Sequence, residues 1–81
     1  MKKYKIKVNT VEQIQAFISI MWNVESDAII RSEDRKYAVD AKSIMGLYSL
    51  DLSKYLILEI NGDEDLFDKF VDANISAEII D

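Results

Sequence analysis

The chain has no histidine, no cysteine and no proline among its 81 residues, and it has only two glycines. The absence of cysteine excludes disulfides, a thiol nucleophile and a thiolate metal site. Without histidine as well, a metal ion would have to be bound by oxygen ligands alone. Because the chain has no histidine, it also cannot carry a phosphoryl group on an imidazole ring.

The acidic balance of the chain argues against nucleic-acid binding. Its formal net charge is -5, and the phosphate backbone of a nucleic acid repels such a surface. The clustered lysines at positions 2, 3, 5 and 7 lie in an alternating segment, where the last three share one solvent-facing side of a strand. No apolar run reaches membrane-spanning length and the N-terminus lacks a signal-peptide core, so we expect a cytoplasmic protein without membrane contact.

Alternating or apolar-rich segments predict the strands. Tyr4, Ile6 and Val8 alternate with the lysines, as in a half-buried strand. Further strands are predicted at 27–32 and 36–40, joined by the polar turn 33–35, and at 55–61. The tail carries Ile75, Ile79 and Ile80, which would either cover a sheet edge or pair with another copy.

Three segments have the features of helices. From Val11 to Trp22 apolar residues recur every three or four positions, which is typical of an amphipathic helix, and Thr10 with Gln13 fits a capping box at its start. A short helix is expected over 43–50, and a last helix is expected to open at the acidic run 63–65, since carboxylates suit a first turn. The first helix is expected to bury Phe17, Met21 and Trp22.

The segment Lys42-Ser43-Ile44-Met45-Gly46, followed by Ser49 and Leu50, resembles the regulatory-serine segment of the HPr family, the phosphocarriers of the bacterial phosphotransferase system. The order β-α-β-β-α-β-α fits both an HPr arrangement and a ferredoxin-like one. The resemblance favours the first, so the expected fold is α+β, a two-layer open-faced β-sandwich formed by one domain, 1–81.

The resemblance also implies a regulatory site. In HPr the serine equivalent to Ser43 is phosphorylated by HPr kinase, and the phosphoserine form binds a transcriptional regulator. Ser43 fits an N-cap, which is the alternative explanation for a serine at this position. The resemblance assigns partner binding to Ile44, Met45 and Leu47. Leu47 is expected in the core, while for Ile44 and Met45 core and surface are equally consistent with the pattern.

The departures from HPr concern its carrier site. Where the family has histidine-alanine-arginine-proline, this chain has Thr10-Val11-Glu12-Gln13, so Thr10 and Glu12 mark a degenerate phosphocarrier site. Glu12 would repel a phosphoryl group, and Thr10 is better explained as a helix cap. No lysine or arginine lies between Lys7 and Arg31, which weakens attraction to an acidic partner.

These features predict a non-catalytic, HPr-like regulatory or protein-interaction module without a cofactor or a metal. Its expected partners are proteins, among them HPr kinase or a transcriptional regulator, and its oligomeric state is left open. One alternative is an active phosphocarrier with an acceptor other than histidine. Another is a scaffold with the HPr fold and no link to sugar transport. The available carboxylates, lysines and tyrosines form no recognisable catalytic constellation, so no enzymatic activity is expected.

Overall fold

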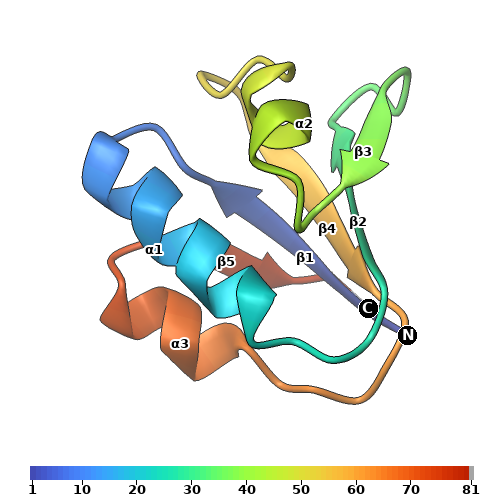
Figure 1. The fold of residues 1–81 in the computed structure, drawn as a ribbon, viewed down its shortest axis with the longest axis vertical. Coiled ribbons are helices and arrows are strands. Elements are labelled where there is room, and N and C mark those ends of the chain that lie inside the picture. The colour runs from blue at the N-terminus through green and yellow to red at the C-terminus, as the bar shows by residue number, and fades with distance from the viewer. Residues whose placement is uncertain (81) are drawn as a thin grey trace.

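In the computed structural model, which describes residues 1–80, three helices lie on one face of a five-stranded antiparallel sheet (Figure 1). The strand order is β3-β2-β4-β1-β5, and the opposite face of the sheet is open. The predicted fold class, an α+β open-faced β-sandwich of two layers, is confirmed. The strands are β1 (Lys2–Lys7), β2 (Ala28–Ser32), β3 (Ala38–Asp40), β4 (Leu56–Ile60) and β5 (Ser76–Ile79), and the helices are α1 (Val11–Trp22), α2 (Ile44–Tyr48) and α3 (Phe67–Asp72).

The final strand, β5, was not predicted. It pairs antiparallel with β1, and the turn before it places Asn74 in the left-handed region at φ 59°, which asparagine tolerates better than most residues. Gln13 fixes this turn by donating its side-chain N–H to the Asn74 carbonyl at 2.7 Å. Of the two arrangements considered for the tail, covering a sheet edge or pairing with another copy, the structure has the first, with β5 along β1. Ile75, at the start of this segment, is buried.

The predicted start of the last helix at the acidic run 63–65 is wrong, because α3 begins at Phe67. Two of these acidic residues, Glu64 and Asp65, have other contacts. Glu64 accepts hydrogen bonds from the N–H and Oγ–H of Ser26, and Asp65 accepts from the N–H of Phe67. The Leu66 N–H donates to the hydroxyl oxygen of Tyr4 on β1. Helix α3 therefore begins at Phe67, just beyond the residues that make these contacts.

The core lies between the sheet and the helices and follows the predicted alternation of β1. Tyr4, Ile6 and Val8 are buried, while the lysines between them are half-buried on the open face. Three aromatic rings form its centre: Tyr4 meets Phe70 edge-on at 5.5 Å, and Phe70 stacks on Phe17 at 6.1 Å. The remaining core residues are Ile14, Met21, Val24, Ala28, Ile30, Ala41, Leu47, Leu50, Leu56, Leu58, Ile60, Leu66 and Ile75.

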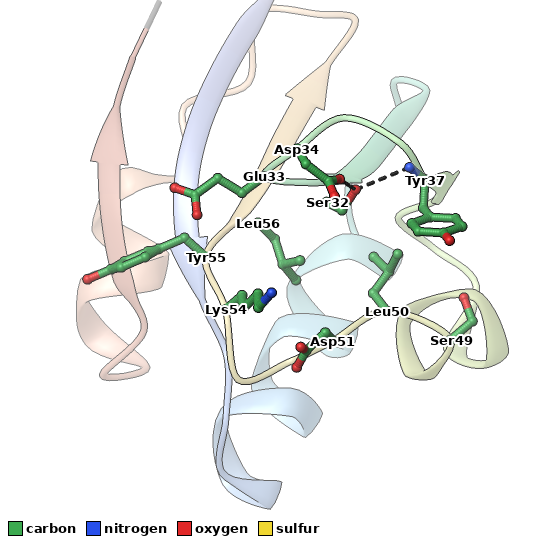
Figure 2. A pocket seen from close by; sticks show the side chains of 10 residues that line it. All are labelled: Ser32, Glu33, Asp34, Tyr37, Ser49, Leu50, Asp51, Lys54, Tyr55 and Leu56. Atoms are coloured by element: carbon green, nitrogen blue, oxygen red, sulfur yellow. Dashed lines mark hydrogen bonds between the residues drawn. The ribbon is translucent and has the colours of Figure 1, made fainter.

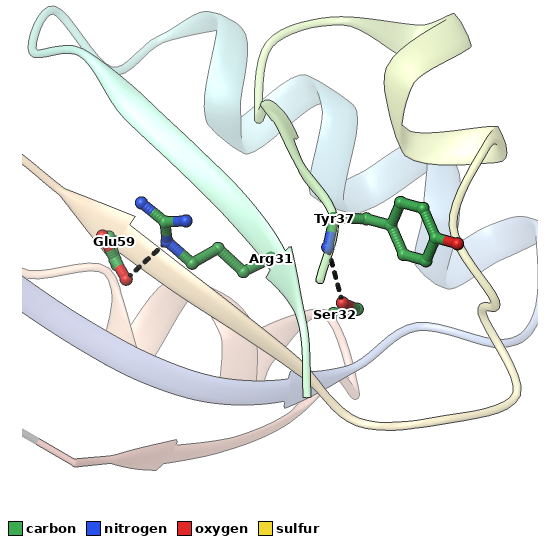
Figure 3. Close-up of polar contacts among 4 residues, drawn as sticks. All are labelled: Arg31, Ser32, Tyr37 and Glu59. Carbon is green, nitrogen blue, oxygen red and sulfur yellow. Dashed lines mark hydrogen bonds and ion pairs between the residues drawn. The ribbon is translucent and has the colours of Figure 1, made fainter. Parts of the chain in front are cut away.

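On the open face, ion pairs connect neighbouring parts of the sheet. Arg31 of β2 donates from Nε to Oε2 of Glu59 on β4 at 3.0 Å (Figure 3). Lys5 of β1 lies 3.3 Å from Glu33, and its ammonium group stands over the Tyr55 ring. Such partly exposed pairs contribute little stability, so the fold depends mainly on the apolar side of the sheet.

Tyr4 joins β1 to the start of α3 through its hydroxyl group. The Tyr4 side chain is 1% exposed, and its oxygen accepts a hydrogen bond from the Leu66 N–H at 3.1 Å. Without this acceptor the Leu66 N–H would be buried and unpaired, which costs free energy.

We expect Tyr4→Phe to lower the free energy of unfolding by about 1–3 kcal/mol, because the ring stays while the acceptor is lost. Tyr48→Phe is the matched control, since Tyr48 is exposed, and it should change stability by less than about 0.5 kcal/mol. Urea denaturation of both variants measures the difference. Equal stabilities of the two variants would contradict this role of Tyr4.

A second link joins the loop after α1 to the loop after β4. The Glu64 carboxylate accepts from Ser26 Oγ at 2.6 Å and from Ser26 N at 3.1 Å. A Cβ at Gly62 would overlap the Ser26 side chain, so the glycine makes room for this contact. These two bonds, the side-chain one first, hold the pKa of Glu64 below its ordinary value of 4.5.

Because the folded-state pKa of Glu64 is lowered, its contribution to stability is complete above the ordinary value and is lost as the pH falls through the lowered one. We therefore expect Glu64→Gln to reduce stability at neutral pH and to flatten the loss of stability in acid. Urea midpoints measured from pH 7 downwards test this. The exposed Glu12→Gln variant serves as the control, and a pH profile for Glu64→Gln that matches wild type would refute the link.

Candidate docking surface on the second helix

The position of α2 is set by one buried side chain and one cap. With five residues, α2 is too short to be stable in isolation. Leu47 is fully buried beneath it, as predicted for the core, and Ser43 caps its start by accepting the Gly46 N–H at 3.0 Å. At the other end, Ser49 Oγ donates to the Gly46 carbonyl. The helix therefore has a fixed inner side and a fixed outer side.

The close approach of α2 to β3 depends on a glycine. A Cβ added at Gly46 would lie 3.0 Å from the Val39 Cβ and 3.2 Å from Ser43 Oγ. The Val39 Cβ is attached to the backbone of β3 and cannot rotate away. Gly46 thus allows the helix to rest closely on the strand, and any side chain at this position would crowd both Val39 and the Ser43 hydroxyl.

Because Leu47 points inward, other large side chains of α2 point to solvent. Met45 is 85% exposed, Tyr48 57% and Ile44 40%. Ile44 and Met45, for which core and surface were equally consistent with the sequence, are therefore surface residues. Of the three partner-binding residues implied by the resemblance, only Leu47 lies beneath this surface.

Trp22 extends the surface toward α1. Its indole Nε1–H donates to the Lys42 carbonyl at 3.2 Å, which brings the ring to the start of α2, and the side chain is 63% exposed. The prediction that Trp22 is a core residue is wrong, because consecutive helix residues are rotated by about 100° and Met21 already occupies the buried side. We call Trp22, Ile44, Met45 and Tyr48 together the α2 surface.

An open cleft lies beside this surface, between the β2–β3 turn and the segment that follows α2 (Figure 2). Its volume is about 540 Å³. Of its three carboxylates, Glu33 pairs with Lys5, while Asp34 and Asp51 accept hydrogen bonds from their own turns. The lining residues are Ser32, Glu33, Asp34, Tyr37, Ser49, Leu50, Asp51, Lys54, Tyr55 and Leu56.

Those two carboxylates act as structural acceptors. Asp34 accepts from Ser32 Oγ and from the Lys36 N–H, and both bonds lower its pKa, the first more strongly. Asp51 accepts from the Oγ–H and N–H of Ser53, which lower its pKa in the same order. A carboxylate with a lowered pKa stays ionised at neutral pH, so neither is suited to donate a proton as a general acid.

Thr10 and Glu12, the residues that the resemblance aligns with a phosphocarrier site, lie at the far end of α1 from Trp22. Thr10 Oγ1 accepts the Gln13 N–H at 3.1 Å, and Gln13 Oε1 accepts the Thr10 N–H at 3.2 Å, which confirms the predicted capping box. Glu12 is exposed in the first turn. The Thr10 hydroxyl is therefore engaged as a cap, and the carboxylate beside it is free to repel an anion.

Within residues 1–80, no three acidic side chains gather closely enough to hold a metal ion. In the same part of the chain, no helix has both the length and the apolar character needed to cross a bilayer. No family model, curated protein or solved structure matches the chain. The chemistry that the α2 surface itself supplies is apolar contact.

We expect Leu47→Ala to lower the free energy of unfolding by about 2–5 kcal/mol, because it empties the contact that holds α2. Met45→Ala, on the same helix but exposed, should change it by less than about 0.5 kcal/mol. Urea denaturation checks both values. A large loss in Met45→Ala would mean that Met45 is needed for packing and is not available to a partner.

Proposed function

We propose that this chain is a non-catalytic, HPr-like interaction module of the cytoplasm that docks a protein partner through the α2 surface. The observation that carries this proposal is the gathering of four large apolar side chains, all at least 40% exposed, around a helix that is anchored from below. Tryptophan, tyrosine and methionine are enriched at the centres of protein interfaces. Methionine in addition adapts its shape to more than one partner.

The link to HPr is supported by residues and by fold class together. The segment 42–46 that resembles the HPr regulatory site forms the start of α2, in an open-faced β-sandwich of the expected size. The carrier residues are missing at the same time, since the chain has no histidine and Thr10 is used as a cap. The combination favours a relative that has given up phosphoryl transfer and retained the docking helix.

We further propose Ser43 as the regulatory phosphosite of this module. Ser43 is half-buried at the start of α2, and its hydroxyl oxygen already accepts the Gly46 N–H, so the site presents a backbone donor to an oxygen at this position. A phosphoryl group there adds a charge of about -1.5 to -2 at the edge of an apolar surface. Phosphorylation would therefore weaken apolar docking and favour a partner with basic residues, as expected for a transcriptional regulator that recognises phosphoserine.

Incubation with HPr kinase and ATP, followed by intact mass measurement, tests the proposal. We expect the mass gain of one phosphoryl group on wild type and on Ser49→Ala, and none on Ser43→Ala. Ser49 is the matched control because it is an exposed serine at the other end of the same helix.

The same assay tests docking. Met45→Asp should slow the modification at least about tenfold, a loss of about 1.4 kcal/mol of binding, whereas Val11→Asp, which replaces an exposed apolar residue at the start of α1, should not slow it. An unmodified wild type under conditions that modify authentic HPr would overturn the phosphosite. Equal rates for Met45→Asp and Val11→Asp would overturn the α2 surface as the docking site.

A further inference from the structure

The two edges of the sheet differ in how well they are protected. At one edge, β3 has only three residues, packs beside α2, and is flanked by Lys36 and Lys42. Short strands, lysines and covering elements are the usual means of preventing edge-to-edge pairing. At the other edge, β5 has the sequence Ser-Ala-Glu-Ile without lysine, proline or a bulge, and among residues 1–80 its only strand neighbour is β1.

The free side of β5 presents unpaired backbone groups. The Ile80 N–H donates to the Lys3 carbonyl, and the β1–β5 register continues this pairing to Lys5 opposite Glu78. Hydrogen-bonded pairs alternate along an antiparallel ladder, so the N–H and C=O of Ala77 and Ile79 point away from β1. Within residues 1–80, no hydrogen-bond partner faces these four groups.

Apolar side chains accompany this open edge. Ile79 shares the helix-facing side of the sheet with Tyr4, opposite to it in register, and is 56% exposed. Val71 of α3, the helix that packs on β5, is 53% exposed. Ala77, next to Ile79 on the same side of the strand, is small and half-buried. The exposed Ile79, the small Ala77 and the unpaired backbone groups therefore lie next to one another along the free edge of β5.

We propose that this edge pairs with β5 of a second copy, in an antiparallel two-fold arrangement with Ala77 opposite Ile79 of the other copy. This register uses all four outward groups of each chain, and it places the large Ile79 against the small Ala77 on both sides of the axis. The same operation brings α3, which packs on β5, toward its equivalent in the second copy. A second copy fits because its edge has the same spacing of donors, acceptors and apolar side chains, which a two-fold interface requires.

The same register also places two like charges opposite each other, which makes the association depend on salt in a measurable way. Glu78 lies on the axis and would face Glu78 of the second copy on the open side of the sheet, where directly opposed like charges destabilise pairing. Lys5 is opposite Glu78 in the same chain, but its ammonium group is paired with Glu33. Each copy in addition carries a net charge of -5. Association should therefore strengthen when salt is added.

Sedimentation velocity on the full chain, from micromolar to millimolar concentration, tests this interface. We expect a monomer–dimer equilibrium that shifts toward dimer with added salt. Ile79→Lys should weaken it at least about tenfold, because it removes the apolar contact and adds a lysine to the edge. Val11→Lys is the matched control, since it introduces the same charge at an exposed valine of α1 and should leave the equilibrium within about twofold of wild type.

Two more variants make the test independent of any single substitution. Glu78→Gln should tighten the dimer about two- to fivefold by removing the opposed charges. Ala77→Pro removes an outward N–H and places a ring methylene on the free edge, so it should also weaken the dimer. Circular dichroism checks that each variant folds, and Ala77→Pro keeps the test valid if Ile79→Lys does not fold. A wild type and a Glu78→Gln variant that both stay monomeric would overturn the proposal. So would a dimer that neither Ile79→Lys nor Ala77→Pro weakens.

Discussion

The burial of Leu47 is the contact on which the candidate site depends. A helix of five residues has too few internal hydrogen bonds to persist alone, so its place is decided by the side chain that enters the core. Once Leu47 points inward, Met45 and Tyr48 must point outward. The contact that completes the core therefore also creates the exposed apolar surface. Turning Met45 and Tyr48 inward would expose Leu47 and lower the stability of the fold.

Two further contacts extend the exposed apolar surface from α2 to its neighbours. Gly46 lets α2 rest on β3, and the Trp22 indole bonds to the Lys42 carbonyl, so elements far apart in sequence meet at the start of α2. Ser43 lies at this meeting point as the cap of the helix. A charge added there would change the surface where its apolar side chains are most concentrated, which is why capping and regulation are compatible roles for one serine.

The sequence predicts the features that arise from local pattern. The alternation of β1, the amphipathic α1 and the capping box of Thr10 and Gln13 follow from spacing. The element order left two arrangements open, and the resemblance of residues 42–46 to the HPr segment favoured the open-faced sandwich. Features set by tertiary contacts escaped prediction. The start of α3 is delayed because Glu64 bonds to Ser26, and β5 forms because β1 offers it an edge. At the site, Trp22 has a core-like spacing, but Met21 takes the buried position beside it, and the Trp22 side chain is exposed and donates to the Lys42 carbonyl.

The claim that α2 and Trp22 form a docking surface is tested most directly by nuclear magnetic resonance. Isotope-labelled chain would be titrated with unlabelled HPr kinase while its backbone amides and its single tryptophan indole are observed. The account predicts that the indole N–H signal and the amides of residues 42–48 change together, while the open face of the sheet is unaffected. Binding that perturbs only the open face or β5, and leaves these signals in place, would contradict it.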